Sequence, residues 1–302
     1  MAVVDVLVTG AGGVLGREIV NLLRPQYHVV ACGRVPGENI DAVWDIVRHD
    51  TLTPDCEPEI VVHGAARIAG YKQSLSNALS LFETNVLGTV QVVRWCALKQ
   101  VKKLIILSSA IVYGEWQDFP KSEADPVKPW VAGPYAVSKW CGEQAAHLVK
   151  ECGCKLSILR LSSLFGPKYI NGLPQRMISQ GLRTGSIEVA PPFETAFDIM
   201  YVSDAARAVE LAVASEDVGL WNIGSGRLTT VRKLAELCAY HLGVKTVLSE
   251  KDIHGKEPLI LNWVNDERAR RKLGHTNEIS LDEGISSIVH ENKNGLLKAM
   301  LQ

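Results

Sequence analysis

A tyrosine and a lysine stand four residues apart in the segment GPYAVSKW, at Tyr135 and Lys139. That spacing places both side chains on one face of a helix, one turn apart. A phenol has a reference pKa of about 10 and is a poor acid or base at neutral pH, unless a nearby cation stabilises its phenolate. Lys139 can supply that cation. Because the same pair occurs by chance on solvated helices, it predicts chemistry only in combination with other motifs.

Two apolar runs upstream of this helix end in small or hydroxyl residues. The run LIILSS ends at Ser109, and the run EIVVHGAA ends in small residues that include Ala65 and Ala66. The carboxyl ends of parallel strands meet at one edge of a sheet, where ligands bind. We therefore expect Ser109 to donate a hydrogen bond to a substrate oxygen beside Tyr135. A carbonyl or alcohol oxygen held from two sides is what hydride transfer requires.

A glycine-rich turn, VTGAGGVLG at residues 8 to 16, follows the apolar run VVDVLV and precedes REIVNLLR, whose apolar spacing predicts a helix. A strand, a glycine turn and a helix N-terminus form an anion site, because free N–H groups and the positive end of the helix dipole coincide there. Gly10, Gly13 and Gly16 make G-x-x-G-x-x-G, not the more common G-x-G-x-x-G. We expect a dinucleotide pyrophosphate at this turn; the alternative is a tight turn with close helix packing.

Strand-like runs alternate with helical patterns through the first half of the chain. HVVACG, EIVVHGAA and KKLIILSS are predicted strands, separated by helical segments such as SNALSLFETNVLGTVQVVRWCALKQ. Such alternation predicts an α/β fold with a Rossmann-type, doubly wound parallel sheet. We expect a dinucleotide-binding domain at residues 1–160. Residues 161–302 should form a smaller, interleaved C-terminal substrate lobe, with segments near 198–225 returning to the first domain.

Composition favours a small-molecule partner. The chain has 302 residues, 47% of them hydrophobic, and a formal net charge of −1 with both signs mixed along its length. This balance argues against nucleic acid as a partner, and no apolar run is long enough to cross a membrane. Seven cysteines, among them Cys152 and Cys154, lack paired C-x-x-C spacing, so we expect no metal site and a cytoplasmic location.

The motifs TGAGGVLG, HGAA, LSSAIVYG and PYAVSK, followed by LRLSSLFGP, FDIMYVSDAARA and WNIGSGRLTTVRKLAEL, resemble the extended short-chain dehydrogenase/reductase family. The likeness is to its nucleotide-sugar epimerase and dehydratase branch and covers nearly the whole chain. It implies that Tyr135 is the acid/base, that Lys139 lowers the Tyr135 pKa and holds the nicotinamide ribose, and that Ser109 binds the reacting oxygen. It also implies a homodimer packed through helices around residues 78 to 100 and 135 to 150.

The resemblance further implies a set of cofactor contacts. The glycines of the turn would cradle the pyrophosphate, WDI would contact adenine, and HGAA would line the ribose and phosphates. Asn85 matches a helix asparagine of the family that orients the end of the sheet. The implied cofactor residues are Gly10, Gly13, Val14, Leu15, Gly16, Asp45, Ile46, Ala65 and Ala66, together with Tyr135 and Lys139.

One departure from the family pattern concerns cofactor choice. Many NAD-dependent members resemble V-x-x-x-D at the end of the second strand, whereas this chain has Gly33 followed by Arg34. A carboxylate there would repel a 2′-phosphate, and an arginine beside a small residue would bind it. NADP is therefore favoured over NAD. The alternative is that Arg34 stacks on adenine or faces solvent.

Two more departures concern the reaction and the substrate. Dehydratases resemble S-x-D-E-V-Y-G, but Ala110 and Ile111 replace the acidic pair here, so dehydration is disfavoured. The motifs that bind a substrate diphosphate carry Asn and Arg, where this chain has Ser163 and Phe197. Either another cation replaces the lost contact, or the substrate has no diphosphate at that place. The candidate cations are Lys168, Arg176 and Arg183.

The sequence thus supports an NAD(P)-dependent epimerase or keto-reductase that acts on a nucleotide-activated sugar by hydride transfer. Ser109, Ser163 and Phe197 are the expected substrate contacts. An NADPH-dependent reductase of a non-nucleotide ketone or aldehyde is the second reading. A cofactor-sensing protein that keeps the fold without chemistry is the third, and the intact Ser109, Tyr135 and Lys139 set argues against it.

Overall fold

The computed structural model describes residues 3–48, 53–68, 75–114, 116, 119–169, 172–249 and 259–300. Its described strands form a seven-stranded parallel sheet in the order β10-β6-β5-β4-β1-β2-β3. The chain leaves β1 for β2 on one side and returns to β4 on the other, so the strand order reverses beside β1. The predicted Rossmann-type, doubly wound sheet is confirmed. The strands are β1 (Val3–Thr9), β2 (Val29–Gly33), β3 (Ala42–Val43), β4 (Glu57–His63), β5 (Lys103–Ser109), β6 (Lys155–Leu161) and β10 (Leu220–Ile223).

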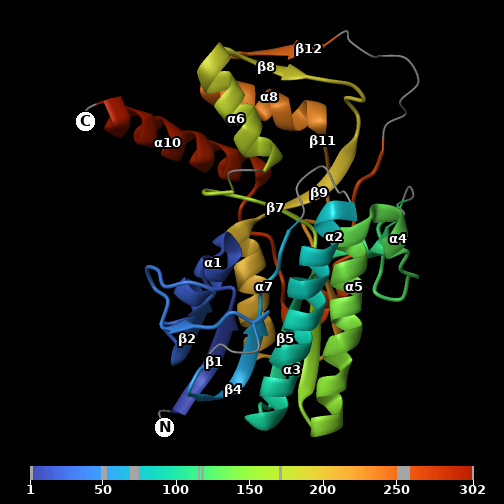
Figure 1. Cartoon of the computed structure of the whole chain (residues 1–302). Helices are drawn as coiled ribbons and strands as arrows, with labels where there is room; N and C mark the ends of the chain where they lie inside the picture. The colour runs from blue at the N-terminus through green and yellow to red at the C-terminus, as the bar shows by residue number, and fades with distance from the viewer. Residues whose placement is uncertain are drawn as a thin grey trace.

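Helices cover both faces of this sheet, as Figure 1 shows. Alternate residues of each strand face opposite sides: in β5, Ile105 and Leu107 pack on one side, and Leu104 and Ile106 on the other. Strands buried on both faces read as continuous apolar runs, which explains KKLIILSS. One side is covered by α1 (Val14–Leu23), α7 (Val202–Ala214) and α9 (Glu267–Leu273), and the other by α3 (Gly88–Leu98), α5 (Pro134–Ala146) and η3 (His147–Cys152).

The predicted helix over 76–100 is interrupted. It consists of α2 (Leu75–Phe82), one π-helical turn, η1 (Glu83–Leu87), and α3. The apolar spacing of residues 76–100 does not predict the extra residue in this turn. The π turn carries Asn85, which is 3% exposed, and such turns are frequent at functional sites.

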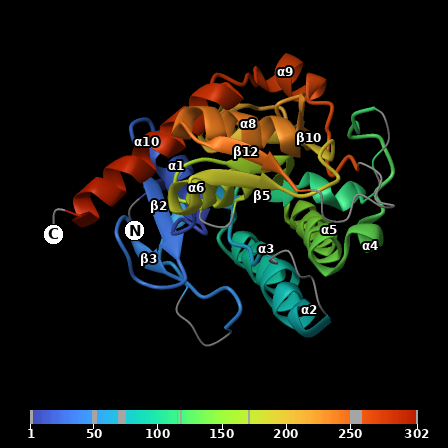
Figure 2. The same ribbon diagram turned by 90° about the horizontal axis from the view of Figure 1, so that it is seen from above.

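A smaller lobe lies above the carboxyl ends of the strands, as Figures 1 and 2 show. Its apolar core joins α6 and α8 with the buried side of a three-stranded sheet, β11-β9-β7. Between β9 and β11 the chain passes back to the large sheet, where α7 packs on α1 and β10 pairs with β6. The lobe elements are β7 (Ser163–Phe165), α6 (Leu173–Thr184), β8 (Ser186–Val189), β9 (Ala196–Tyr201), β11 (Leu228–Thr230), α8 (Val231–Leu242), β12 (Lys245–Leu248) and α10 (Leu281–Met300).

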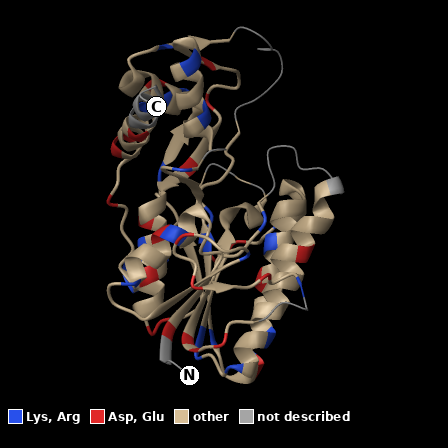
Figure 3. Cartoon of the chain, turned by 60° about the vertical axis from the view of Figure 1, so that its left-hand side comes forward, with Lys and Arg blue, Asp and Glu red and all other residues tan. Residues whose placement is uncertain are grey.

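Charged residues of both signs are interspersed along the ribbon drawn in Figure 3, as the mixed composition predicted. Among the described helices, none is long and apolar enough to cross a bilayer.

Candidate active site

The glycine turn fits an anionic group. Gly10 has a φ of 73°, and a Cβ there would lie 2.6 Å from the Ala65 nitrogen, so the turn packs directly on the loop after β4. Helix α1 begins at Val14, its N-cap Gly13 offers no side-chain acceptor, and its first turn carries no acid. The first N–H groups of a helix have no partner within the helix. Those of Val14 and Leu15 can therefore hold the pyrophosphate of a dinucleotide.

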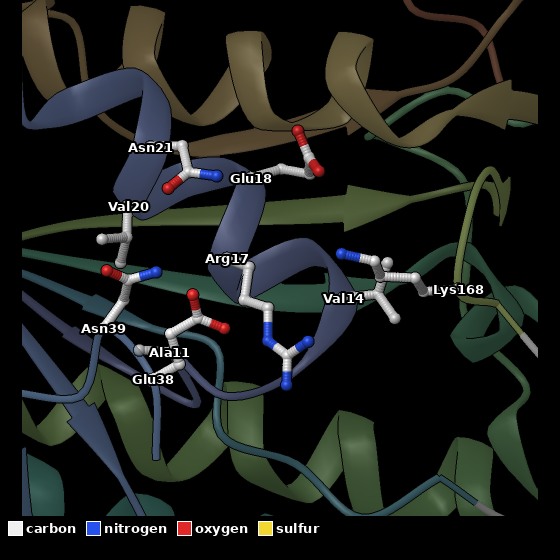
Figure 4. Close-up of a pocket in the computed structure, with 9 residues that line it drawn as sticks. All are labelled: Ala11, Val14, Arg17, Glu18, Val20, Asn21, Glu38, Asn39 and Lys168. Atoms are coloured by element: carbon white, nitrogen blue, oxygen red, sulfur yellow. The ribbon is translucent and has the colours of Figure 1, made fainter. Parts of the chain in front are cut away.

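A pocket of about 160 Å³ opens beside this turn. Figure 4 shows Arg17 reaching into it from α1, Glu38 from the loop after β2, and Lys168 from the opposite wall. Arg34, the residue predicted to select NADP, is exposed and lies outside the lining of this pocket. A cofactor at the turn can thus contact two cations, Arg17 and Lys168, and the carboxylate of Glu38. The lining consists of Ala11, Val14, Arg17, Glu18, Val20, Asn21, Glu38, Asn39 and Lys168.

Ser109, Tyr135 and Lys139 lie on two elements that pack together at the carboxyl end of β5. Tyr135 occupies the first turn of α5, which packs against β5 and against the 3-10 turn η2 (Ala110–Tyr113). Lys139 Nζ donates to the carbonyl oxygen of Leu107, 2.7 Å away. Ser109 Oγ accepts from the Ile111 nitrogen at 3.3 Å and caps η2. Among the described residues no acceptor takes the hydroxyl proton of Ser109, so this proton can be donated to a ligand.

Burial shifts the protonation of this group. Removal from water raises the pKa of Tyr135 to about 12. Burial lowers the pKa of Lys139 to about 8, although the Glu143 carboxylate acts in the opposite direction. In the chain alone Tyr135 is therefore a neutral phenol at physiological pH. The predicted lowering of its pKa needs the positive charge of Lys139, or of an oxidised nicotinamide, close to the phenol oxygen.

A buried ion pair, which the sequence did not predict, joins α5 to β6. Glu143, one turn after Lys139, accepts from Arg160 of β6 at 3.0 Å and 2.8 Å, and from Ser108 Oγ at 2.5 Å. The two charged side chains are 2% and 7% exposed. Glu143 and Lys139 together fix α5 to the end of β5, because they bond Ser108 and Leu107, the two residues before Ser109.

Asn85 joins α5 to the loop after β4. Its side chain accepts from the Arg67 nitrogen at 2.7 Å, donates to the Arg67 oxygen at 3.0 Å, and donates to Ser138 Oγ at 2.9 Å. The Ser138 hydroxyl donates in turn to the Tyr135 carbonyl, 2.8 Å away. A Cβ at Gly142 would lie 2.6 Å from the Asn85 oxygen, so α5 and the π turn are in close contact.

The remaining predicted residues lie in varied surroundings. Ile46 is 6% exposed and packs toward α3, whereas Asp45 and Ala65 are half-buried and Ala66 is exposed. Phe197 is 5% exposed and belongs to the apolar core of the lobe. Ser163 Oγ accepts from Asn262 Nδ2 at 2.8 Å. Phe197 thus presents no polar group to a substrate.

Comparison with known proteins identifies the family. A family model described as the NAD dependent epimerase/dehydratase family matches residues 6–224. The UDP-glucose 4-epimerase of Mycolicibacterium smegmatis is 28% identical over 95% of this chain and 98% of its own length. The dTDP-4-dehydro-6-deoxyglucose reductase of Escherichia coli is 32% identical over 62% of this chain and 60% of that protein.

Solved structures extend the likeness to the whole chain. MoeE5 in complex with UDP-glucose and NAD is 27% identical, with a TM-score of 0.81 over 97% of this chain and 99% of the other. The UDP-glucose 4-epimerase of Thermotoga maritima with UDP-glucose is 26% identical, with a TM-score of 0.79 over 97% and 99%. The chain belongs to the NAD dependent epimerase/dehydratase family.

Proposed function

We propose that this protein interconverts or reduces a nucleotide-activated sugar by hydride transfer, as an NAD(P)-dependent 4-epimerase or keto-reductase. The observation that carries the proposal is the bond from Lys139 Nζ to Leu107 at the carboxyl end of β5. It puts the lysine of the Tyr/Lys pair at the edge of the sheet where the glycine turn also lies. Relatives named as nucleotide-sugar epimerases over nearly the full chain support the substrate class.

In this proposal each residue has one task. Bound NAD(P) supplies the acceptor and donor of the hydride. Tyr135 takes the proton from the sugar hydroxyl as the carbonyl forms and returns it when the carbonyl is reduced. The Lys139 ammonium stabilises the phenolate, and Ser109 donates a hydrogen bond to the reacting oxygen. The alanine and isoleucine after Ser109 supply no additional acid or base for elimination.

We also propose a preference for NADP, carried by Arg34. Its guanidinium is exposed directly after Gly33, where a ribose 2′-phosphate would be bound in this fold. Glu38 of the same loop opposes this preference, since its carboxylate lines the pocket beside the turn. Calorimetric titration with NADH and NADPH decides the matter. Equal affinity for the two would make Arg34 a surface or adenine contact.

A homodimer is part of the proposal. Four leucines that are at least half exposed lie on or beside the helices expected to form it: Leu79, Leu87, Leu98 and Leu148. They share the side of the sheet covered by α3 and α5. Exposed apolar side chains gathered on one face are typical of protein interfaces. A single-chain mass at all concentrations in solution scattering would contradict this.

The decisive experiment is a substrate screen. The protein is incubated with UDP- and dTDP-sugars, and with their 4-keto forms, in the presence of NAD, NADH, NADP or NADPH. Proton NMR detects inversion at C4, and absorbance at 340 nm detects net reduction, which consumes reduced cofactor. Inversion without net cofactor change identifies an epimerase. Absence of both reactions, and of any thermal shift by a nucleotide sugar, would refute the proposal.

The position of Phe197 favours a second candidate, an NADPH-dependent reductase of a non-nucleotide ketone or aldehyde. Its ring is buried in the lobe where a phosphate-binding arginine is expected from the family pattern. That exchange removes a charge-assisted contact with a diphosphate. Turnover of simple keto-sugars and aldehydes, with no binding of nucleotide sugars, would establish this alternative.

A further inference from the structure

A chain of buried hydrogen bonds crosses the molecule beneath the proposed cofactor site. Thr9 ends β1 at the glycine turn, His63 ends β4, and Thr89 lies in the first turn of α3. Thr9 Oγ1 lies 2.7 Å from His63 Nδ1, and His63 Nε2 lies 3.1 Å from Thr89 Oγ1. Each of the three side chains is 3% exposed or less. His63 therefore bridges the glycine turn and the helix layer that contains α5.

The partners of the ring determine where its proton is. The Thr89 hydroxyl donates its single hydrogen to the Asn85 carbonyl, 2.8 Å away, because a carbonyl can only accept. Thr89 Oγ1 must then accept from His63 Nε2–H. A neutral ring protonated at Nε2 leaves Nδ1 as an acceptor for the Thr9 hydroxyl. Thr9 Oγ1 is in turn the acceptor for the Ala65 nitrogen at 3.3 Å. Every hydrogen in this chain has one consistent position.

This series of hydrogen bonds continues to the helix that carries the proposed acid/base. From Thr89 it reaches the backbone of Asn85, whose side chain holds the loop after β4 at Arg67 and donates to Ser138. Ser138 donates to the carbonyl of Tyr135. One set of bonds thus connects the turn that would hold the pyrophosphate with the first turn of the helix that carries the phenol.

The same surroundings keep the ring neutral. Burial, together with the charge of Lys139, lowers the pKa of His63 to about 3. A neutral imidazole puts no second positive charge near the Lys139 ammonium. It also keeps one donor and one acceptor, which its two hydroxyl partners require.

We propose that His63 is a positioning residue that holds the glycine turn and the helix of Tyr135 in one arrangement, so that bound cofactor and acid/base are aligned. This inference rests on the proposed function. Two amide substitutions at His63 test its two hydrogen bonds separately. Asn in place of His63 keeps an acceptor at the position of Nδ1, and Gln keeps a donor at the position of Nε2.

The kinetic test uses His63→Asn, His63→Gln and, as a matched exposed control, His290→Asn on α10. Asn should leave dinucleotide affinity within about twofold and lower turnover at saturating cofactor roughly tenfold, because alignment with α5 is lost. Gln should raise the dinucleotide Kd roughly 5- to 10-fold, which corresponds to the loss of about one net hydrogen bond. It should leave turnover at saturating cofactor within about twofold of the parent. The control should match the parent in both measurements.

A second measurement is made on the parent protein and uses a variant only to assign its signals. In protein labelled with ¹⁵N at histidine, the His63 signals, assigned by their loss in His63→Asn, should show the neutral Nε2–H form between about pH 5 and 8. A ring protonated at Nδ1, or one that titrates near its ordinary pKa, would overturn the inference.

The kinetic outcomes separate the inference from the proposed function. Asn and Gln variants that match the parent, or that lose affinity and turnover together in proportion to their melting temperatures, would overturn the positioning role while the function stands. A parent protein that binds neither NAD nor NADP would overturn both.

Discussion

Glu143→Gln offers a sharp test of how the structure holds α5 against the sheet. The substitution keeps the shape of the side chain and one acceptor oxygen, but it turns an NH₂ group toward the donors of Arg160 or Ser108. The guanidinium of Arg160 then stays 7% exposed without a counter-charge. Removing one partner of a buried ion pair costs about 3–5 kcal/mol. Because the amide retains one hydrogen bond, we expect the lower end, about 3 kcal/mol.

Urea unfolding followed by tryptophan fluorescence measures this free energy. Glu59→Gln is the matched control, since the Glu59–Lys102 pair has a similar N–O distance, 2.5 Å, but side chains that are 52% and 70% exposed. An exposed pair contributes about 0.2–1 kcal/mol. Replacing Glu143 and Arg160 together by Met should recover most of the loss, because no unpaired charge remains. Equal costs for the two Gln variants would refute the reasoning.

The same variant has a kinetic consequence. The Glu143 carboxylate raises the pKa of Lys139 against the effect of burial, which holds it at about 8. Without that charge the pKa of Lys139 falls. Because the proposed mechanism needs Lys139 as an ammonium, the alkaline limb of the pH profile of kcat should move to lower pH. An unmoved limb in a folded Glu143→Gln variant would remove Lys139 protonation from the reaction.

Four further changes have expected outcomes. Tyr135→Phe should lower turnover roughly 10²-fold or more with cofactor affinity unchanged, measured by steady-state kinetics and calorimetry. Arg34→Ala should weaken NADPH binding by roughly 10- to 100-fold and leave NADH unaffected. Gly142→Ala brings a Cβ to within 2.6 Å of the Asn85 oxygen, so it should cost about 1–3 kcal/mol in urea unfolding. The folded-state pKa of His63, about 3, lies below its ordinary 6.5, so its stability contribution is present above pH 6.5 and falls toward pH 3. Between these two pH values His63 should make the free energy of unfolding fall by about 1.4 kcal/mol per pH unit, and His63→Asn should remove this dependence. Urea unfolding at pH 7, 5.5 and 4 measures it.

The parts of the fold that the sequence predicted are those governed by local pattern. HVVACG, EIVVHGAA and KKLIILSS correspond to β2, β4 and β5, because strands buried on both faces have to be apolar along their whole length. The glycine turn was readable because Gly10 needs a positive φ and close contact with Ala65. The π turn at Asn85 was not readable, since one extra residue in a turn hardly alters apolar spacing over a long helix.

The buried hydrogen bonds and the ion pair of the site could not be predicted from the sequence, for a different reason. Glu143 and Arg160 are 17 residues apart in the sequence and meet only when α5 packs against the sheet. In the sequence alone, each resembles an ordinary surface charge. His63 lies in a motif read only for its small residues, and its two partners come from β1 and α3. A buried polar residue carries its signal in its partners, which the fold brings together from distant segments. The local sign in the sequence was a histidine directly after the apolar run IVV at the end of β4. Burial there demands hydrogen bonds on both nitrogens, so the partners of such a histidine must come from the elements that flank the end of its strand.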